Sequence, residues 1–210
     1  MAVKKHSAVL LFGPPGVGKG TQGQILGNIP GFFHLSSGDV FRSLEIGSAE
    51  GKEVYRYISK GELVPDEVTM SIWQKGLKGQ IGVTAFKPYE DLLVLDGIPR
   101  NVKQAELLES EVNVMRVVQL YCGDEEQMIH RIKRRAIREN RVDDANEHVI
   151  RQRFTVYHAQ SEPVLRYYPD EMIFQVDAMK SPAEVLKQVL EVLIPVQNEL
   201  YQSGVMKSED

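Results

Sequence analysis

The sequence predicts an α/β fold in which a five-stranded parallel sheet is covered by helices on both faces. Short apolar runs, each the length of one buried strand, alternate with longer segments in which apolar residues recur with helical period. Strands and helices that alternate in this way form parallel sheets. The chain has 210 residues, of which 42% are hydrophobic, which is enough for one well-buried core with modest insertions.

Five apolar runs are the expected strands. Four are clear and one is shorter: 8–12, 92–95, 117–121 and 172–176, with the shorter run at 32–35. Helical period is visible in two segments between them, through Met128, Ile129, Ile132 and Ala136, and through Val149, Ile150, Phe154 and Tyr157. We expect Pro163 to break the second of these helices.

The last helix has the clearest start signal. Ser181 is the expected N-cap, Pro182 occupies the first turn, and Glu184 completes a capping box. One face is apolar and carries Val185, Val189, Val192 and Leu193. Beyond Pro195, the polar end at 207–210 is expected to be weakly structured.

Composition limits the class of protein. The formal net charge of -4 argues against a protein that coats nucleic acid, although the 25 Lys and Arg residues could gather around a polyanionic ligand. The single cysteine, Cys122, excludes an internal disulfide and a multi-cysteine zinc site. No apolar run reaches membrane-spanning length, and no cleavable signal peptide fits before residue 13. We therefore expect a cytoplasmic protein without nucleic-acid or membrane partners.

A glycine-rich loop follows the first strand and precedes a helix. Its sequence, Gly-Pro-Pro-Gly-Val-Gly-Lys-Gly-Thr at 13–21, is typical of a P-loop, in which backbone N–H groups at a helix N-terminus bind phosphate. Lys19 adds a positive charge for the β and γ phosphates. Gly20 stands where Ser or Thr usually meets magnesium, and the hydroxyl follows one residue later at Thr21. A glycine-rich turn without a ligand is the alternative.

This loop resembles that of the nucleoside monophosphate kinases, and of adenylate kinases in particular. Further segments resemble the family in the family's order: 36–42, 61–66, 96–100 and 141–144. The resemblance implies a P-loop NTPase fold and reversible, magnesium-dependent phosphoryl transfer from ATP to AMP, giving two ADP. It also implies a single kinase domain, usually a monomer, with a core of 1–36, 66–133 and 145–210, a monophosphate-binding insertion at 37–65 and a lid at 134–144.

The resemblance also assigns the donor site. ATP is expected to bind Gly16, Val17, Gly18, Lys19, Gly20, Thr21, Arg131, Arg135 and Lys180. Arg131 and Arg135 are four residues apart and share a helix face. Taken alone, the basic stretch 130–153 could equally be a solvated helix face or a nucleic-acid patch. Only five residues separate Arg135 from Arg141, so the lid is expected to be short and to lack zinc.

The acceptor site follows in the same way. AMP is expected to bind Ser37, Arg42, Val64, Gly97, Arg100, Gln104, Arg141 and Arg153. Guanidinium groups suit the phosphate because they stay charged and bind its oxygens bidentately. Gln104 stands where adenylate kinases carry a glutamine that reads adenine, whereas relatives acting on UMP or CMP usually carry asparagine. Ser37 keeps the hydroxyl of the usual threonine. A solvated helix residue is the alternative for Gln104.

The expected chemistry requires fixed positive charge rather than a strong general base, because the attacking oxygen of AMP is already anionic. The expected catalytic residues are Lys19, Arg42, Arg100, Arg135, Arg141 and Arg153. Asp96, at the end of a predicted strand, is expected to organise Mg²⁺ through water, with a purely structural acid as the alternative. Asp143 and Asp144 are expected to pair with lid or core cations when the lid closes, with solvated acids as the alternative for both.

Two other functions stay open from the sequence. One is a UMP/CMP-type kinase on the same frame, and the other is a nucleotide-binding regulatory module that has lost catalysis. His34, His158, Trp73 and Cys122 have no partner pattern that suggests chemistry, so packing is the expected role of each.

Overall fold

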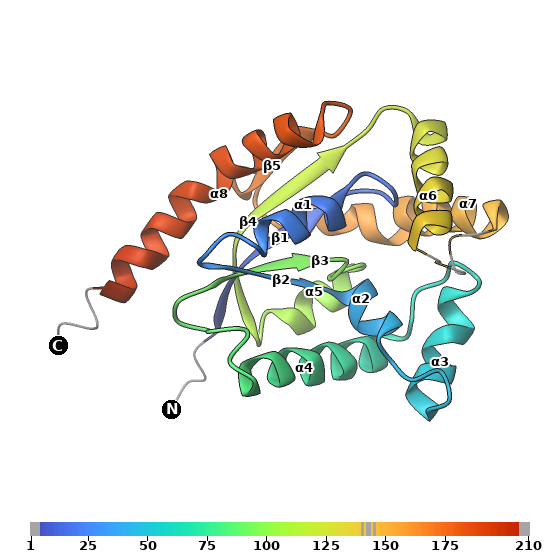
Figure 1. Cartoon of the computed structure of the whole chain (residues 1–210), viewed down its shortest axis with the longest axis horizontal. Coiled ribbons are helices and arrows are strands. Elements are labelled where there is room, and N and C mark those ends of the chain that lie inside the picture. Colours follow the sequence, from blue (N-terminus) through green and yellow to red (C-terminus); the bar gives the residue numbers. More distant parts are fainter. Residues whose placement is uncertain (1–4, 140, 142–143, 145, 206–210) are drawn as a thin grey trace.

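A computed structural model describes residues 5–139, 141, 144 and 146–205. Its centre is a sheet of five parallel strands in the order β2-β3-β1-β4-β5 (Figure 1). The strands are β1 (His6–Phe12), β2 (Phe32–Ser36), β3 (Leu92–Asp96), β4 (Val112–Tyr121) and β5 (Ile173–Asp177). All five predicted strands are confirmed, including the short one.

Helices connect the strands and lie on both faces of the sheet (Figure 1). They are α1 (Lys19–Leu26), α2 (Ser37–Arg42), α3 (Ala49–Ile58), α4 (Asp66–Gly82), α5 (Val102–Leu108), α6 (Glu125–Glu139), α7 (Glu147–Val156) and α8 (Pro182–Val205). In the described part of the chain, no helix combines the length and the apolar character needed to cross a membrane.

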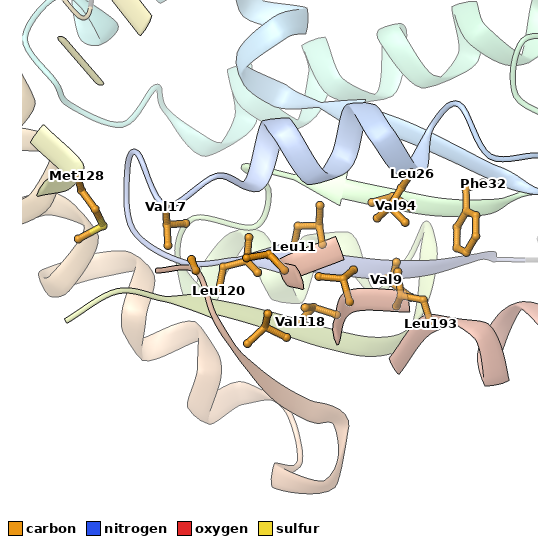
Figure 2. Close-up of a cluster of buried hydrophobic side chains, with 14 of the residues drawn as sticks. Val9, Leu11, Val17, Leu26, Phe32, Val94, Val118, Leu120, Met128 and Leu193 are labelled. Carbon is orange, nitrogen blue, oxygen red and sulfur yellow. The ribbon is translucent and has the colours of Figure 1, made fainter. Parts of the chain in front are cut away.

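Alternating residues of β1 divide the core into two layers, because successive strand side chains point to opposite faces. Val9 and Leu11 pack with side chains of α1, α6 and α8, as Figure 2 shows. Ala8 and Leu10 pack on the other face, where α4 and α5 lie. The two layers together cover the sheet, so β1 is almost completely buried.

A third, smaller cluster lies outside these layers. It joins Phe41 of α2 and Val54 of α3 to Val64 and to Ile72 of α4. The segment around α2 and α3 therefore has apolar contacts of its own, next to the main core.

The helix around Pro163 differs from the prediction. The α-helix ends at Val156, but the chain stays helical through a π-helical turn, Tyr157–Ser161, and a 3₁₀ segment, Glu162–Tyr167. Pro163 lies in the first turn of the 3₁₀ segment, the part of a helix where proline is best tolerated. The expectation that Pro163 breaks the helix was therefore wrong.

The capping box of α8 is confirmed. The Glu184 amide donates to Ser181 Oγ at 3.3 Å, and the Ser181 amide donates back to Glu184 Oε2 at 3.3 Å. Val185, Val189 and Leu193 are buried, and Val192 packs at the edge of the same cluster. The helix continues through Pro195 as far as Val205, and the segment 207–210 lies outside the described residues.

Candidate functional site

The site lies where the carboxyl ends of the parallel strands meet, which is the usual position for ligands in such sheets. A cleft of about 990 Å³ opens there. Its walls come from the loop after β1, from α2, from the segment after β3, from α6 and from the start of α8. Segments that are far apart in the sequence therefore face one space.

The glycine-rich loop is fitted tightly between β1 and α1. Gly16 has a φ of +77°, and a Cβ there would lie 2.8 Å from the Met128 carbonyl oxygen. Val17 is buried and packs into the core cluster with Leu11 and Leu120, which fixes the loop to the sheet (Figure 2). The N-cap of α1 is Gly18, which has no side chain to accept from the first helical N–H groups. No capping side chain at this position therefore competes with a ligand for these groups.

Lys19 lies inside the cleft, against the loop. Its Nζ donates to the carbonyl oxygens of Gly13, at 2.6 Å, and Pro14, at 3.0 Å. Burial lowers the pKa of this ammonium group to about 8, and the charges of Arg100 and Arg135 act in the same direction. A negatively charged ligand beside Lys19 would therefore stabilise the charged form of its ammonium group.

Asp96 ends β3 and is almost fully buried beside the loop. A Cβ on Gly20 would lie 3.5 Å from Asp96 Oδ2, at ordinary contact distance, so the carboxylate lies directly beside the start of α1. Burial raises the pKa of Asp96, but His34, Lys19 and Arg100 outweigh this and hold the pKa below its usual value. His34 Nε2 is 3.8 Å from Asp96 Oδ2, too far for a hydrogen bond. The sequence, which indicated only packing for His34, did not predict this contact with Asp96.

Two arginines lie on the side of the cleft away from the loop. Arg42, at the end of α2, binds Asp39 Oδ1 at 2.6 Å. Arg100, after β3, donates from Nε to the Gly97 carbonyl oxygen at 2.7 Å. Burial and the charges of Arg153 and Arg42 lower the pKa of Arg100 to about 10, against the opposing effect of Asp96. Crowded positive charge of this kind is suited to an anionic ligand.

Three further arginines come from α6, α7 and the segment between them. Arg135 Nη2 is 2.6 Å from Asp144 Oδ2, and Arg153 binds the other oxygen of the same carboxylate. Arg141 Nε is 2.7 Å from Glu139 Oε2, and its Nη2 is 3.9 Å from Asp39 Oδ1. The predicted pairing of Asp144 with cations is confirmed, whereas Asp143 lies outside the described residues.

The opposite end of the cleft is formed by α6 and the start of α8. Arg131 donates to the Ala178 carbonyl oxygen at 3.2 Å, which joins α6 to the end of β5, and Lys180 also faces the cleft. Gln22, for which the sequence gave no signal, is buried and donates to the Pro182 carbonyl oxygen at 3.1 Å. These contacts fix the wall of the cleft nearest to α8.

Most of the predicted site residues line this one cleft: Gly16, Val17, Gly18, Lys19, Gly20, Thr21, Arg42, Asp96, Gly97, Arg100, Arg131, Arg135, Arg141, Arg153 and Lys180. Three predicted acceptor residues do not. Val64 and Gln104 line a small cavity of about 10 Å³ that shares Gly97 and Arg100 with the cleft. Ser37 is buried and donates to the Gly97 carbonyl oxygen at 2.6 Å.

Gln104 is held by contacts that the sequence did not indicate. Its Oε1 accepts from the Arg100 amide at 2.8 Å, and its Nε2 donates to Asp66 Oδ1 at 2.8 Å. Asp66 was visible only as the last residue of the 61–66 motif, with no role assigned. Ser161, whose hydroxyl donates to the Arg100 carbonyl oxygen at 2.7 Å, had no sequence signal at all.

Asp96 is the carboxylate beside the glycine-rich loop where a divalent cation could be held. Within the described residues, no group of three or more His, Cys, Asp or Glu side chains is arranged to hold a metal ion. The buried, ionised Asp96 beside the loop nevertheless fits Mg²⁺, which usually keeps several waters and binds one or two carboxylates together with substrate phosphates. The same donor set does not fit zinc, which prefers nitrogen and sulfur ligands.

Comparison with known proteins gives consistent matches. The family model for adenylate kinase matches residues 11–173. An adenylate kinase of Thermobifida fusca (strain YX) is 38% identical over 191 residues, covering 88% of this chain and 97% of the relative. One of Parasynechococcus marenigrum (strain WH8102) is 36% identical over 193 residues, with coverages of 89% and 98%. Adenylate kinase isoenzyme 1 of Gallus gallus is 31% identical over 193 residues, with coverages of 91% and 96%.

Proposed function

We infer that the cleft transfers a phosphoryl group between ATP and AMP, since the chain belongs to the adenylate kinase family. The enzyme is a nucleoside monophosphate kinase, and nothing in the matches favours the UMP/CMP-type alternative. One observation carries the assignment of the site: a single cleft is lined by Lys19 and by arginines from α2, from the segment after β3, and from α6, α7 and the segment between them. Two polyanionic substrates require such a concentration of fixed positive charge.

ATP is proposed to bind along the N-terminus of α1. Its phosphates take the backbone N–H groups of the loop from Gly16 to Thr21 and replace the carbonyl partners of Lys19. Arg131 and Lys180 lie on the α8 side, where the adenine and ribose fit, and Arg135 lies nearer to the phosphates. The support for this placement is that all of these residues face the cleft.

AMP is proposed to bind on the opposite side, with its phosphate between Arg42 and Arg100. Arg141, between α6 and α7, and Arg153, on α7, also line the cleft, and they are proposed to reach the transferred group. The base is proposed to lie toward Ser37, Val64, Gly97 and Gln104, beside the small cavity that adjoins Arg100. Gln104 offers both donors and acceptors, as adenine requires.

In the reaction, an oxygen of the AMP phosphate forms a bond to the γ phosphorus as the bond to the β–γ bridging oxygen breaks, and both products are ADP. The attacking oxygen is already anionic, so no side chain has to remove a proton. Lys19 and the arginines match the charge that spreads over the transferring group. Asp96 is proposed to hold Mg²⁺ through its waters, and the bound ion would neutralise part of the charge of the donor phosphates.

Water is a competing acceptor, so the reaction requires a closed site. We propose that residues 37–65 and 134–144 move over the core residues 1–36, 66–133 and 145–210. The apolar contacts among Phe41, Val54 and Val64 support the first segment as a unit, and Ile72 joins this cluster from α4 of the core. The 3.9 Å approach of Arg141 to Asp39 supports a meeting of the two segments over the cleft.

The enzyme is further proposed to act as a cytoplasmic monomer on free nucleotides, without nucleic-acid or membrane partners. The single free cysteine, Cys122, is compatible with a reducing compartment.

The decisive experiment measures ADP formation from ATP and Mg²⁺ with AMP, UMP, CMP and GMP offered separately at equal concentration. Turnover with AMP far above the other three is the expected result. Faster turnover with UMP or CMP would overturn the assigned acceptor, and ATP binding without turnover for any of the four would overturn the assigned activity.

A further inference from the structure

We propose that Asp66 is a positioning residue that fixes the orientation of the Gln104 side-chain amide, and that the acceptor site thereby selects a 6-aminopurine over a 6-oxopurine. The inference rests on the proposed function, in which Gln104 faces the acceptor base. It adds a residue that touches no substrate and a discrimination between purines.

The four residues involved form one connected set of hydrogen bonds. Gln104 Oε1 accepts from the backbone N–H of Arg100, and Gln104 Nε2 donates to Asp66 Oδ1, both at 2.8 Å. Asn101 Nδ2 donates to the same Asp66 oxygen at 2.9 Å, while Asn101 Oδ1 accepts from the Gln104 backbone N–H at 2.7 Å. Gln104 is only 1% exposed, so these contacts are made away from bulk water.

These partners allow one orientation of the amide. A backbone N–H can only donate and a carboxylate oxygen can only accept. If the Gln104 amide were turned over, its NH₂ group would face the Arg100 N–H and its oxygen would face the Asp66 carboxylate. Both hydrogen bonds would then be replaced by repulsive contacts in a buried site, where unsatisfied polar groups are costly.

The fixed amide keeps a defined pattern for a ligand. A side-chain amide has two donor hydrogens and two acceptor lone pairs, and the contacts with Arg100 and Asp66 use one of each. One N–H of Nε2 and one lone pair of Oε1 remain, with their relative order decided by Asp66 and Arg100. The Gln104 amide can therefore present one donor and one acceptor, but it cannot exchange them.

The two kinds of purine require opposite orders. The edge of adenine presents an amino donor at position 6 beside a ring-nitrogen acceptor at position 1. The edge of hypoxanthine, the base of IMP, presents a carbonyl acceptor beside a ring N–H donor. A freely turning amide would match either base, whereas a fixed one matches a single order and leaves the other base with two mismatched contacts.

Asp66 is suited to this role by its place in the fold. It is the first residue of α4, and Gln104 lies 38 residues away in the first half of α5. Asn101 is the N-cap of α5 and also holds the Asp66 carboxylate, so the starts of two helices are joined at the same oxygen. The amide orientation is therefore set by how α4 and α5 dock.

The test compares kcat/KM for AMP and for IMP, with ATP as donor, in the full-length enzyme. Asp66→Ser removes the acceptor from the reach of Gln104, and Asp66→Asn keeps a carbonyl oxygen there as the matched control. We expect Asp66→Ser to lower the AMP-to-IMP preference at least about fivefold, since a correct pair of contacts to a base edge commonly discriminates by this much or more. KM for AMP should rise while KM for ATP stays within about twofold, and Asp66→Asn should retain the wild-type preference.

Other outcomes separate the inference from its premise. Wild-type enzyme that does not use AMP would overturn the proposed function, and a Gln104→Ala variant with unchanged preference would overturn the base-reading role and this inference with it. If Gln104→Ala loses the AMP-to-IMP preference but folded Asp66→Ser keeps it, the inference about Asp66 is overturned and the proposed function is not. Should Asp66→Ser fail to fold, Asp66→Ala decides, because alanine also removes the acceptor beside Gln104 and is a strong helix former at the start of α4. An unchanged preference in that variant would overturn the inference.

Discussion

Arg135 of α6 and Arg153 of α7 bind the two oxygens of one carboxylate, that of Asp144. The Asp144 side chain has no exposed surface, whereas both guanidinium groups reach the cleft. The carboxylate therefore holds two cations in place before any nucleotide arrives. Charge that is fixed in advance needs no reorganisation during reaction, which is the main source of electrostatic catalysis.

Asp144→Asn should lower both stability and turnover. The loss of a buried charge that serves two arginines is expected to reduce the free energy of unfolding by about 1–3 kcal/mol and kcat at least about tenfold. Urea unfolding and steady-state kinetics measure the two effects. Glu147→Gln is the control, because Glu147 pairs with Lys133 and Arg151 at the surface, where ion pairs contribute little. Equal effects of the two substitutions would contradict the role of Asp144.

Lys19→Ala should abolish most of the turnover and leave the fold intact. Removal of one cation that faces the transferred phosphoryl group is expected to lower kcat by about 10³-fold or more. Circular dichroism and thermal unfolding check the fold, and the exposed Lys78→Ala serves as the control for loss of a lysine. Retained activity in Lys19→Ala would contradict the assigned role.

ATP binding should take up protons near pH 8. The Lys19 ammonium group has its pKa lowered to about 8 in the free enzyme, so about half of the molecules carry it neutral at that pH. Phosphates nearby raise the pKa again and restore the charge, so uptake approaches about half a proton per site. Calorimetry of magnesium-bound ATP in buffers of different ionisation enthalpy measures this uptake. Lys19→Met should abolish it, and unchanged uptake in that variant would assign the proton to another group.

The same pKa fixes the direction of the pH dependence. Affinity for ATP should be greatest below pH 8, where Lys19 is charged in the free enzyme, and should fall as the pH rises above about 8. An affinity that increases from pH 7.5 to pH 9 would contradict this sign.

Magnesium removal should abolish turnover, and Asp96→Asn should raise the Mg²⁺ concentration needed for half-maximal rate by about tenfold. Asparagine keeps the shape of the side chain but loses the charge that orients bound water. Titration of the rate with Mg²⁺ at fixed ATP measures the change. Glu171→Gln is the control, because Glu171 precedes β5 at the opposite edge of the sheet. An unchanged Mg²⁺ requirement in Asp96→Asn would restrict this carboxylate to a structural role.

Features that depend on neighbouring residues could be predicted from the sequence. The strands, the position of the glycine-rich loop between β1 and α1, and the capping box of Ser181 and Glu184 are all confirmed, because each follows from residues within a few positions of one another. The prediction failed locally only where Pro163 enters a 3₁₀ segment instead of ending the helix. There, packing against the core kept the chain helical after the α-helix had ended.

The sequence also determined which residue types the site contains, since motifs that follow one another along the chain bring most of the arginines to one cleft. The partners of those residues were decided only by the tertiary structure. The approach of His34 to Asp96 depends on two neighbouring strands, and the bond from Gln104 to Asp66 depends on where α4 begins relative to α5. Periodicity and short motifs report contacts between residues close in sequence, whereas these contacts arise from the docking of whole elements.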